Sequence, residues 1–413
     1  MRCVIAVACL VMWLPLWRAE AQPKVTLPMP KPGQLDALVP VMAHSARVVT
    51  VSDTHGLLAF GHWTSFADGQ VSLIRLDAKG TPAASAVYLK LPKPAGLLKN
   101  KNYVTGMAFH PKLPILYAWQ DIDGHYTNPV PATTPAEVKQ FDHLCVYNLA
   151  KDPPELMVHV CRGDEFLFGQ QGGALAVDPT GSYLYVPNLR EIKNAGSLRF
   201  ARFPLDADGL PIIAESKDPA PARIKKIEEL NTAEKFSPPQ ITPIEYVHLF
   251  NLNAYGSGHC FVPIGKDAVI AGGYQGLMTW RPDDKHATLH GLPLRNSGHV
   301  QFAVHPSLPA IFATSHYSPQ NSFFRAEHID GYLTLLPKQY VIEGSKLTGP
   351  PAVFSKAKKL AVGGENALYI IDLDDHGFPT GVPTRVLVNC PQVRAMVYSE
   401  RFERAYVGVE VSK

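Results

Sequence analysis

Short apolar runs separated by turn residues follow one another along most of the chain. They occur in pairs, in which the first run ends in His-Pro, Asp-Pro or a similar turn and the second begins a few residues later. The clear pairs are 106–111 with 115–118, 174–179 with 183–186, and 301–306 with 310–313, and weaker pairs are 351–355 with 360–362 and 394–398 with 405–407. The runs are rich in aromatic and β-branched residues and almost continuously apolar, which is typical of strands buried on both faces. Each pair therefore predicts two neighbouring strands in the interior of a repeated unit.

A second repeat has the form L-D-x-x-G-x-P and occurs at 76–82, 205–211 and 373–379. The aspartate can cap its own turn, the glycine accepts a positive φ, and the proline stops strand pairing at the turn. A strand-like run precedes each copy, for example 71–75. This repeat predicts a hairpin that joins the two outer strands of the unit.

Together the two repeats give four strands per unit at spacings of roughly 40 to 50 residues, the length of a propeller blade. The sequence therefore predicts an all-β fold, a seven-bladed β-propeller of four-stranded blades. Complete units begin near residues 47, 104, 172, 258, 298 and 349, and the chain ends after two strands of a seventh. We expect the apolar runs 25–27 and 38–41 to join this C-terminal half-blade and close the ring, because an open ring leaves sheet edges unpaired. Eight blades, or six with tails, are the alternatives.

The N-terminus carries a targeting pattern. Arg2 precedes an apolar run at 4–17, and Ala19 and Ala21 supply the small residues of a cleavage site. We predict a signal peptide at 1–21 and a single propeller domain at 22–413, with insertions at 121–140 and 217–245. The protein is then secreted or periplasmic, with no membrane span after cleavage. An uncleaved anchor is the alternative.

Charge and cysteine content limit the expected partners and the expected covalent bonds. A formal net charge of +3 with 18% charged residues gives no electrostatic case for nucleic acid, and we expect a monomer. Cys145 and Cys161 flank the turn at 151–154, so strands joined there are expected to bring them opposite each other. In an oxidising compartment they would form a disulfide, and two small buried free thiols are the alternative.

Candidate site residues follow from the geometry of a propeller. Residues just before the first strand of a blade and just after the second converge on one mouth of the channel. His259 and His299 each end a Ser-Gly-His segment directly before a first strand, and they are the candidate catalytic residues. Polar residues that follow second strands are His62, Asn188, Arg190, Tyr274, His316 and Glu365.

These side chains have two functional interpretations. The four imidazoles, including His62 and His316, are a candidate site for a divalent metal, the one cofactor that the sequence indicates. Alternatively, His259 and His299 act as general acid and base that open a ring ester, while Arg190, Asn188, Tyr274 and Glu365 bind the substrate. The third possibility is structural, with each side chain bonded to a neighbouring loop. We expect His110 and His305, inside the His-Pro turns, to lie at the opposite mouth and to be structural.

The strand pairs with Val-Asp-Pro or Val-His-Pro, the first of these followed by Leu-Tyr-Val, resemble the YVTN-type propeller repeat over most of the chain after residue 21. That superfamily includes 6-phosphogluconolactonase-like proteins, and related seven-bladed rings occur in quinoprotein amine dehydrogenase heavy chains. The resemblance implies three possible functions. These are a lactonase-like hydrolase of a small ring ester or sugar derivative, a non-catalytic propeller that binds a protein or glycan at the channel mouth, and a redox subunit whose partner carries the quinone. No contiguous lactonase motif is present, so the resemblance supports the fold and leaves the activity open.

Overall fold

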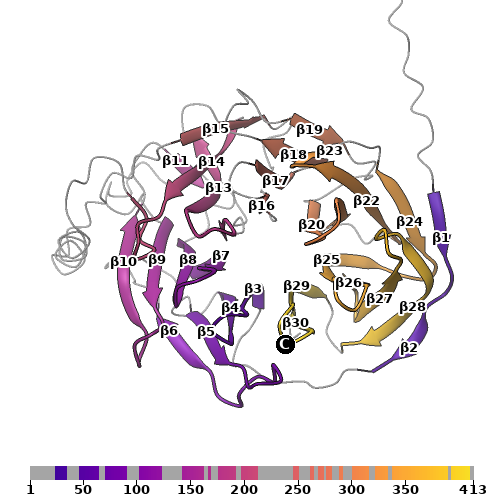
Figure 1. Cartoon of the computed structure of the whole chain (residues 1–413), viewed down its shortest axis with the longest axis horizontal. Helices are drawn as coiled ribbons and strands as arrows, with labels where there is room; N and C mark the ends of the chain where they lie inside the picture. The colour runs from indigo at the N-terminus through magenta and orange to yellow at the C-terminus, as the bar shows by residue number, and fades with distance from the viewer. Residues whose placement is uncertain are drawn as a thin grey trace, which may run out of the picture.

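The computed structural model describes residues 24–34, 46–64, 70–90, 102–122, 142–161, 166–168, 175–191, 197–212, 245–250, 261–264, 268–273, 276–280, 288–291, 300–315, 321–333, 337–388 and 392–409. These residues form strands and turns only, and their sheets stand radially around a ring (Figure 1). The predicted all-β propeller arrangement is confirmed. Within the same residues there is no helix with the length and apolar character needed to cross a membrane.

Four-stranded antiparallel runs, each ordered from the centre of the ring outward, build the first half of the chain. The first two runs share one sheet and consist of β3 (Ala46–Ser52), β4 (Leu57–Thr64), β5 (Gln70–Arg75) and β6 (Val87–Lys90), then β7 (Asn102–Phe109), β8 (Ile115–Ile122), β9 (Asp142–Asn148) and β10 (Glu155–Cys161). The next sheet consists of β12 (Ala176–Val177), β13 (Tyr183–Glu191), β14 (Ser197–Pro204) and β15 (Glu245–Phe250), with β11 (Phe166–Phe168) also paired to β13.

The second half repeats this order. The sheets are β16 (Phe261–Ile264), β17 (Ala268–Gly273), β18 (Gly276–Trp280) and β19 (Thr288–Gly291), then β20 (Val300–Val304), β21 (Ala310–Ser315), β22 (Ser322–Ile329) and β24 (Lys338–Ile342), with β23 (Tyr332–Leu333) paired to β22. After them come β25 (Leu347–Phe354), β26 (Lys359–Gly364), β27 (Ala367–Leu373) and β28 (Pro379–Leu387), and last the two-stranded sheet of β29 (Val393–Ser399) and β30 (Arg404–Val409). We name each unit by its first strand.

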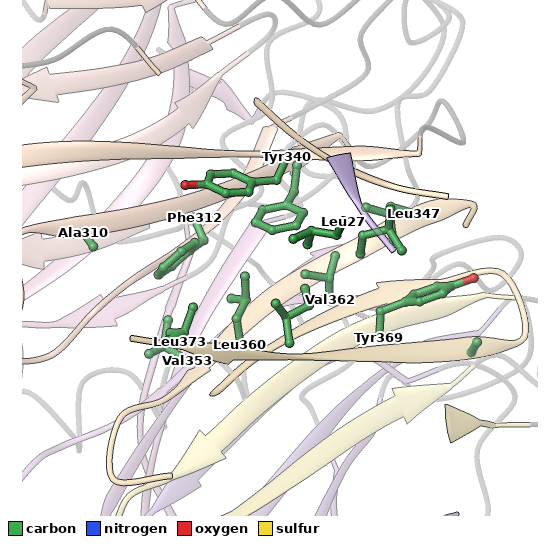
Figure 2. Close-up of a cluster of buried hydrophobic side chains, with 14 residues drawn as sticks. Leu27, Ala310, Phe312, Tyr340, Leu347, Val353, Leu360, Val362, Tyr369 and Leu373 are labelled. Carbon is green, nitrogen blue, oxygen red and sulfur yellow. The ribbon is translucent and has the colours of Figure 1, made fainter. Parts of the chain in front are cut away.

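The N-terminal strands do not join the last unit, which corrects the expected ring closure. β1 (Lys24–Leu27) pairs in parallel with β24, and β2 (Lys31–Gly33) pairs in parallel with β28, on the outer edges of two other units. Figure 1 shows both strands along the outside of the ring. Leu27 is buried in the apolar core between these units, close to Tyr340 and Leu347 (Figure 2). The apolar run at 38–41 lies outside the described residues.

The L-D-x-x-G-x-P turns have the predicted conformation. Asp77, Asp206 and Asp374 each accept hydrogen bonds from backbone N–H groups of their own turn. The glycine of each turn has a φ of 74°, in the left-handed region that glycine enters without steric cost. The hairpins predicted from this repeat are therefore confirmed.

Two of these turns also hold the preceding unit of the ring. The hydroxyl of Tyr117, on β8, donates to the carbonyl oxygen of Gly209 at 2.6 Å, and that of Tyr406, on β30, donates to the carbonyl oxygen of Gly80 at 2.7 Å. Both tyrosines occupy the same position of the second strand. Because β30 belongs to the last unit and Gly80 to the first, the second of these bonds joins the two ends of the ring.

The third turn uses a different donor for the same purpose. Phe312 occupies the tyrosine position in β21 and has no hydroxyl, but its cross-strand partner is Arg325 of β22. The Arg325 guanidinium donates to the carbonyl oxygens of Gly377 and His376, both at 3.0 Å, and lies 3.8 Å from the centre of the Phe378 ring. A buried arginine therefore replaces the tyrosine hydroxyl.

Further contacts close the ring between its last and first units. The hydroxyl of Ser399, at the end of β29, donates to the Asp53 carboxylate, and the Arg401 guanidinium donates to the Asp53 carbonyl oxygen at 2.6 Å. Tyr406 also packs into an apolar cluster with Leu58, Phe60 and Ile74 of the first unit. Side-chain contacts between units, rather than a strand exchanged with the N-terminus, join β29–β30 to the β3 unit in the described residues.

The predicted Cys145–Cys161 disulfide is wrong. β9 and β10 form the expected hairpin, but its centre lies closer to the N-terminus than the sequence indicated. Asn148 pairs with Glu155, and as a result Cys145 faces His159 and Cys161 faces His143. Such diagonal neighbours are roughly 7–8 Å apart, beyond the usual Cα separation of a disulfide. Cys145 is a buried free thiol.

Candidate functional site

The strand registers define two mouths of the ring. At the start mouth, each inner strand begins and the second strand of the same unit ends, as in the pairs Val300–Ser315 and Leu347–Gly364. At the turn mouth, the inner strand passes into the second strand, and the L-D-x-x-G-x-P turns lie beside these inner turns, since Leu373 N–H donates to the Lys358 carbonyl oxygen. The convergence predicted from the repeats is therefore present within these units.

Glu365 lies at the start mouth, where the sequence placed it. Its backbone N–H donates to the Lys346 carbonyl oxygen at 2.9 Å, and its carboxylate accepts a hydrogen bond from the Lys346 ammonium, also at 2.9 Å. The Lys346 side chain is 67% exposed and that of Glu365 34%. An ion pair of this exposure contributes little to stability. Because both side chains reach the solvent, both charges are accessible to a ligand.

Next to this ion pair, the inner strand β25 is irregular. Its register shifts between Leu347 and Pro351, which is the pattern of a β-bulge, a feature often found beside functional sites. Within the bulge, a Cβ on Gly349 would lie only 2.7 Å from the carbonyl oxygen of Val393, so no larger residue fits there. The bulge therefore brings β25 against β29.

Polar side chains from both neighbouring units reach the backbone of this bulge. The Thr314 hydroxyl, from β21, donates to the Gly349 carbonyl oxygen at 2.8 Å. The Gln392 amide, directly before β29, donates to the Thr348 carbonyl oxygen at 3.1 Å. Three consecutive units are thus connected by hydrogen bonds at the start mouth.

Two side-chain oxygens in the same region have no protein hydrogen-bond partner. They are Oγ1 of Thr348, a residue 4% exposed, and Oε1 of Gln301, a residue 7% exposed. Gln301 pairs with Thr314 across β20 and β21, so its side chain lies on the sheet face from which Thr314 reaches Gly349. Buried polar atoms nearly always have a partner, and exceptions of this kind often mark a site for a water, an ion or a ligand.

Sequence reasoning missed Thr348 and Gln301. Both are polar residues inside short apolar strands that otherwise pack into the core. The signal that could have identified them is a polar residue near the start of a predicted inner strand.

His62 is buried against a strand of its own unit. It is 2% exposed, and its Nε2 is 2.6 Å from the Ser72 hydroxyl oxygen, within the β3 unit. In the part of the chain that the structure describes, no group of three or more His, Cys, Asp and Glu side chains is placed to hold a metal ion. The predicted metal site stays a prediction.

The other predicted site residues are only partly described. His259, Tyr274, His299 and His316 lie outside the described residues. Asn188 and Arg190 belong to β13, where Arg190 pairs with Leu198, but their side chains are outside the description. The structure does describe Phe261 and Val300, the first residues of β16 and β20, which follow His259 and His299 closely in sequence.

The histidines of the two His-Pro turns are structural. Nδ1 of His110 accepts the backbone N–H groups of Lys112 and Leu113, and Nε2 donates to the Gly181 carbonyl oxygen at 3.2 Å, in the next unit. Nδ1 of His305 likewise accepts the N–H groups of the two residues after Pro306. Burial lowers the pKa of both histidines below the ordinary value of 6.5. They lie at the turn mouth, as predicted.

Comparison with known proteins identifies the fold. No protein family and no curated protein matches the chain. Among solved structures, it is similar to a chain of the mitotic checkpoint complex, with a TM-score of 0.53, 11% identity, and coverage of 93% of this chain and 92% of that one. It is also similar to the RRP9 WD40 repeats, with a TM-score of 0.52, 8% identity, and coverage of 91% and 90%.

A third similar structure carries the name of an enzyme. A candidate 6-phosphogluconolactonase from Bacteroides uniformis has a TM-score of 0.50 and 13% identity, with coverage of 84% of this chain and 87% of that one. Likeness at such identities establishes the fold and leaves function to the site. The chain is a β-propeller similar in fold both to WD40 proteins and to this lactonase candidate.

Proposed function

We propose that the protein is a seven-bladed propeller that binds a small, neutral, hydroxyl-bearing ligand at its start mouth. The observation that carries the proposal is the pair of buried oxygens, Thr348 Oγ1 and Gln301 Oε1, that have no protein partner. A ligand hydroxyl can donate a hydrogen bond to the Gln301 amide oxygen, and an oxygen of the ligand can accept one from the Thr348 hydroxyl. The Lys346–Glu365 ion pair beside them has no net charge, which fits a neutral ligand better than a strongly charged one.

The seven-blade count treats β29–β30 as the last blade, reduced to its two inner strands. Membership of the YVTN-type superfamily and export after cleavage at Ala21 are further parts of this proposal. The repeats at 174–186 and the apolar run at 4–17 support them.

Binding of D-glucose and of D-glucono-1,5-lactone, measured by calorimetry, tests the proposal. Glu365→Gln removes one charge at the start mouth, and Asp375→Asn is its matched control, because Asp375 forms a comparable exposed ion pair with Lys358 at the turn mouth. We expect Glu365→Gln to weaken binding and Asp375→Asn to leave it unchanged. Binding that responds equally to both variants, or no binding of either compound, contradicts the proposal.

A second candidate function is hydrolysis of a small lactone at the same mouth. The observation that favours it is the repeated Ser-Gly-His segment before β16 and β20, which are the first strands of consecutive units. His259 would act as general base on a water, and His299 as general acid on the leaving oxygen of the ring. In a pH-stat assay with D-glucono-1,5-lactone, His259→Ala and His299→Ala should then abolish turnover and leave binding intact. A wild-type rate equal to the buffer rate eliminates this candidate and keeps the binding function.

A further inference from the structure

The N-terminal segment is held to the ring by few contacts. β1 adds four residues to the edge of β24, and β2 adds three residues to the edge of β28. Within residues 24–34, Leu27 is the one fully buried side chain, and Met29 is 70% exposed. A segment with so little buried surface opens more easily than the ring itself.

The acceptor for this segment is a defined site. It consists of the outer edges of β24 and β28 and of the apolar socket between their units that receives Leu27 (Figure 2). Strand edges bind an extended peptide through backbone hydrogen bonds, and a pocket for one side chain fixes its register. The prolines at 28, 30 and 32 restrict the segment to extended conformations, which lowers the entropy that it loses on docking.

The N-terminal segment docks late in folding, because its acceptor strands lie far from it in the sequence. Leu27 pairs with Ile342, more than three hundred residues later. The segment is therefore made first and remains unpaired until the β20 and β25 units have formed. Long-range pairing of this kind gives other molecules time to compete, and exchange of an identical element is a common route to dimers.

We propose that residues 24–33 exchange between molecules, so that a second copy of the chain places its N-terminal segment on β24 and β28. The contacts made in the exchanged dimer are the same as those within one molecule. High protein concentration during folding therefore favours the dimer, and dilution favours the monomer expected from the sequence. This proposal is independent of the ligand proposed for the start mouth.

Cysteine pairing between separate chains tests the exchange. Lys24 and Gln339 are register partners in the parallel pair of β1 and β24, close enough for a disulfide. One chain carries Lys24→Cys and a second carries Gln339→Cys. The two are unfolded, mixed at high concentration and refolded under oxidising conditions. We expect a covalent dimer that the wild-type mixture does not form, in a yield that rises with protein concentration.

Two further variants complete the test. Leu27→Asp, added to the Lys24→Cys chain, should reduce the dimer at least tenfold, whereas Met29→Asp in the same segment should leave it unchanged. The double variant Lys24→Cys/Gln339→Cys, refolded at high dilution, reports the same register within one molecule by forming its disulfide as a monomer. If the double variant crosslinks and the mixed single variants do not, the segment does not exchange. A double variant that fails to crosslink shows that the docked register is wrong and overturns the proposal as well.

Discussion

Tyr406 gives the sharpest test of how the ring closes. Its hydroxyl is buried and donates to the carbonyl oxygen of Gly80, which is also buried. Tyr406→Phe keeps the ring packing against Leu58 and Phe60 but leaves that carbonyl oxygen without its donor. An unsatisfied buried group costs about 1–3 kcal/mol, so we expect this loss in the free energy of unfolding. For a chain of this length, that corresponds to a fall in Tm of roughly 1–4 °C.

The assay is urea unfolding followed by circular dichroism, with two comparison variants. Tyr117→Phe removes the equivalent bond to Gly209 in another unit and should cost a similar amount. Tyr88→Phe alters a half-buried tyrosine on β6, on the outer part of the first unit, and should cost less than 0.5 kcal/mol, about the limit for substitutions away from special features. If Tyr406→Phe is no more destabilising than Tyr88→Phe, the turn does not hold the ring closed.

The pH dependence of stability gives an independent check on the burial of the Tyr406 hydroxyl. Burial raises the pKa of Tyr406 to about 12, above the ordinary value of 10. A group with a raised pKa in the folded state contributes stability that is fully present below pH 10 and is lost as the pH rises through 12. The stability difference between wild type and Tyr406→Phe should therefore shrink between pH 10 and pH 12. A difference that stays constant over this range contradicts the burial of the Tyr406 hydroxyl.

Further predictions concern other contacts of the ring. Burial lowers the pKa of His110 and His305 in the folded protein, so the unfolded chain binds more protons at acidic pH. The stability that these histidines contribute is therefore fully present above pH 6.5 and should be lost as the pH falls below it. Urea midpoints measured at pH 7.5 and pH 5 test this. The dependence should be weaker in His110→Gln, and an unchanged dependence in that variant would show that other groups cause it. Arg325→Lys cannot donate to two carbonyl oxygens as a planar fork and should lower the free energy of unfolding by about 2 kcal/mol. A neutral effect would show that these two hydrogen bonds add no stability beyond the ion pair with Glu327 and the packing on Phe378. Cys145, buried and unpaired, should react with a thiol reagent only after unfolding, and rapid reaction of the native protein at this residue would contradict its burial.

The repeats allowed the fold to be predicted because each one has a local physical cause. The L-D-x-x-G-x-P turn depends on contacts within a few residues, and the structure shows those contacts. Partners in the ring depend on distant residues and were harder to predict. The apolar run at 25–27 correctly indicated a strand, but every outer edge offers the same backbone groups, so its sequence did not reveal which edge it joins. The Cys145–Cys161 prediction failed for a related reason, because the hairpin pairs Asn148 with Glu155 and Cys145 with His159, and the spacing of the cysteines around the turn does not fix this register.

The prediction of the site residues also depended on whether each position is fixed by the repeat itself or by contacts with distant residues. Glu365 was placed correctly because ring symmetry alone brings the end of a second strand to the start mouth. His62 follows the same rule, yet its neighbour Ser72 shows that a polar residue at a strand end can belong to the interior of its unit. Thr348 was not found because its importance depends on the bulge in β25, and a bulge has no short sequence signature that distinguishes it from a regular strand.

The ligand site at the start mouth is tested most directly by Thr348→Val, measured for both stability and D-glucose affinity. Valine has the shape of threonine without the hydroxyl, and that hydroxyl has no protein partner to lose. We predict that the melting temperature of the ligand-free protein stays the same or rises, and that D-glucose binds about tenfold more weakly, the effect of one lost hydrogen bond. A lower melting temperature with unchanged affinity would assign the hydroxyl to an ordered water in the ring and contradict the proposed site.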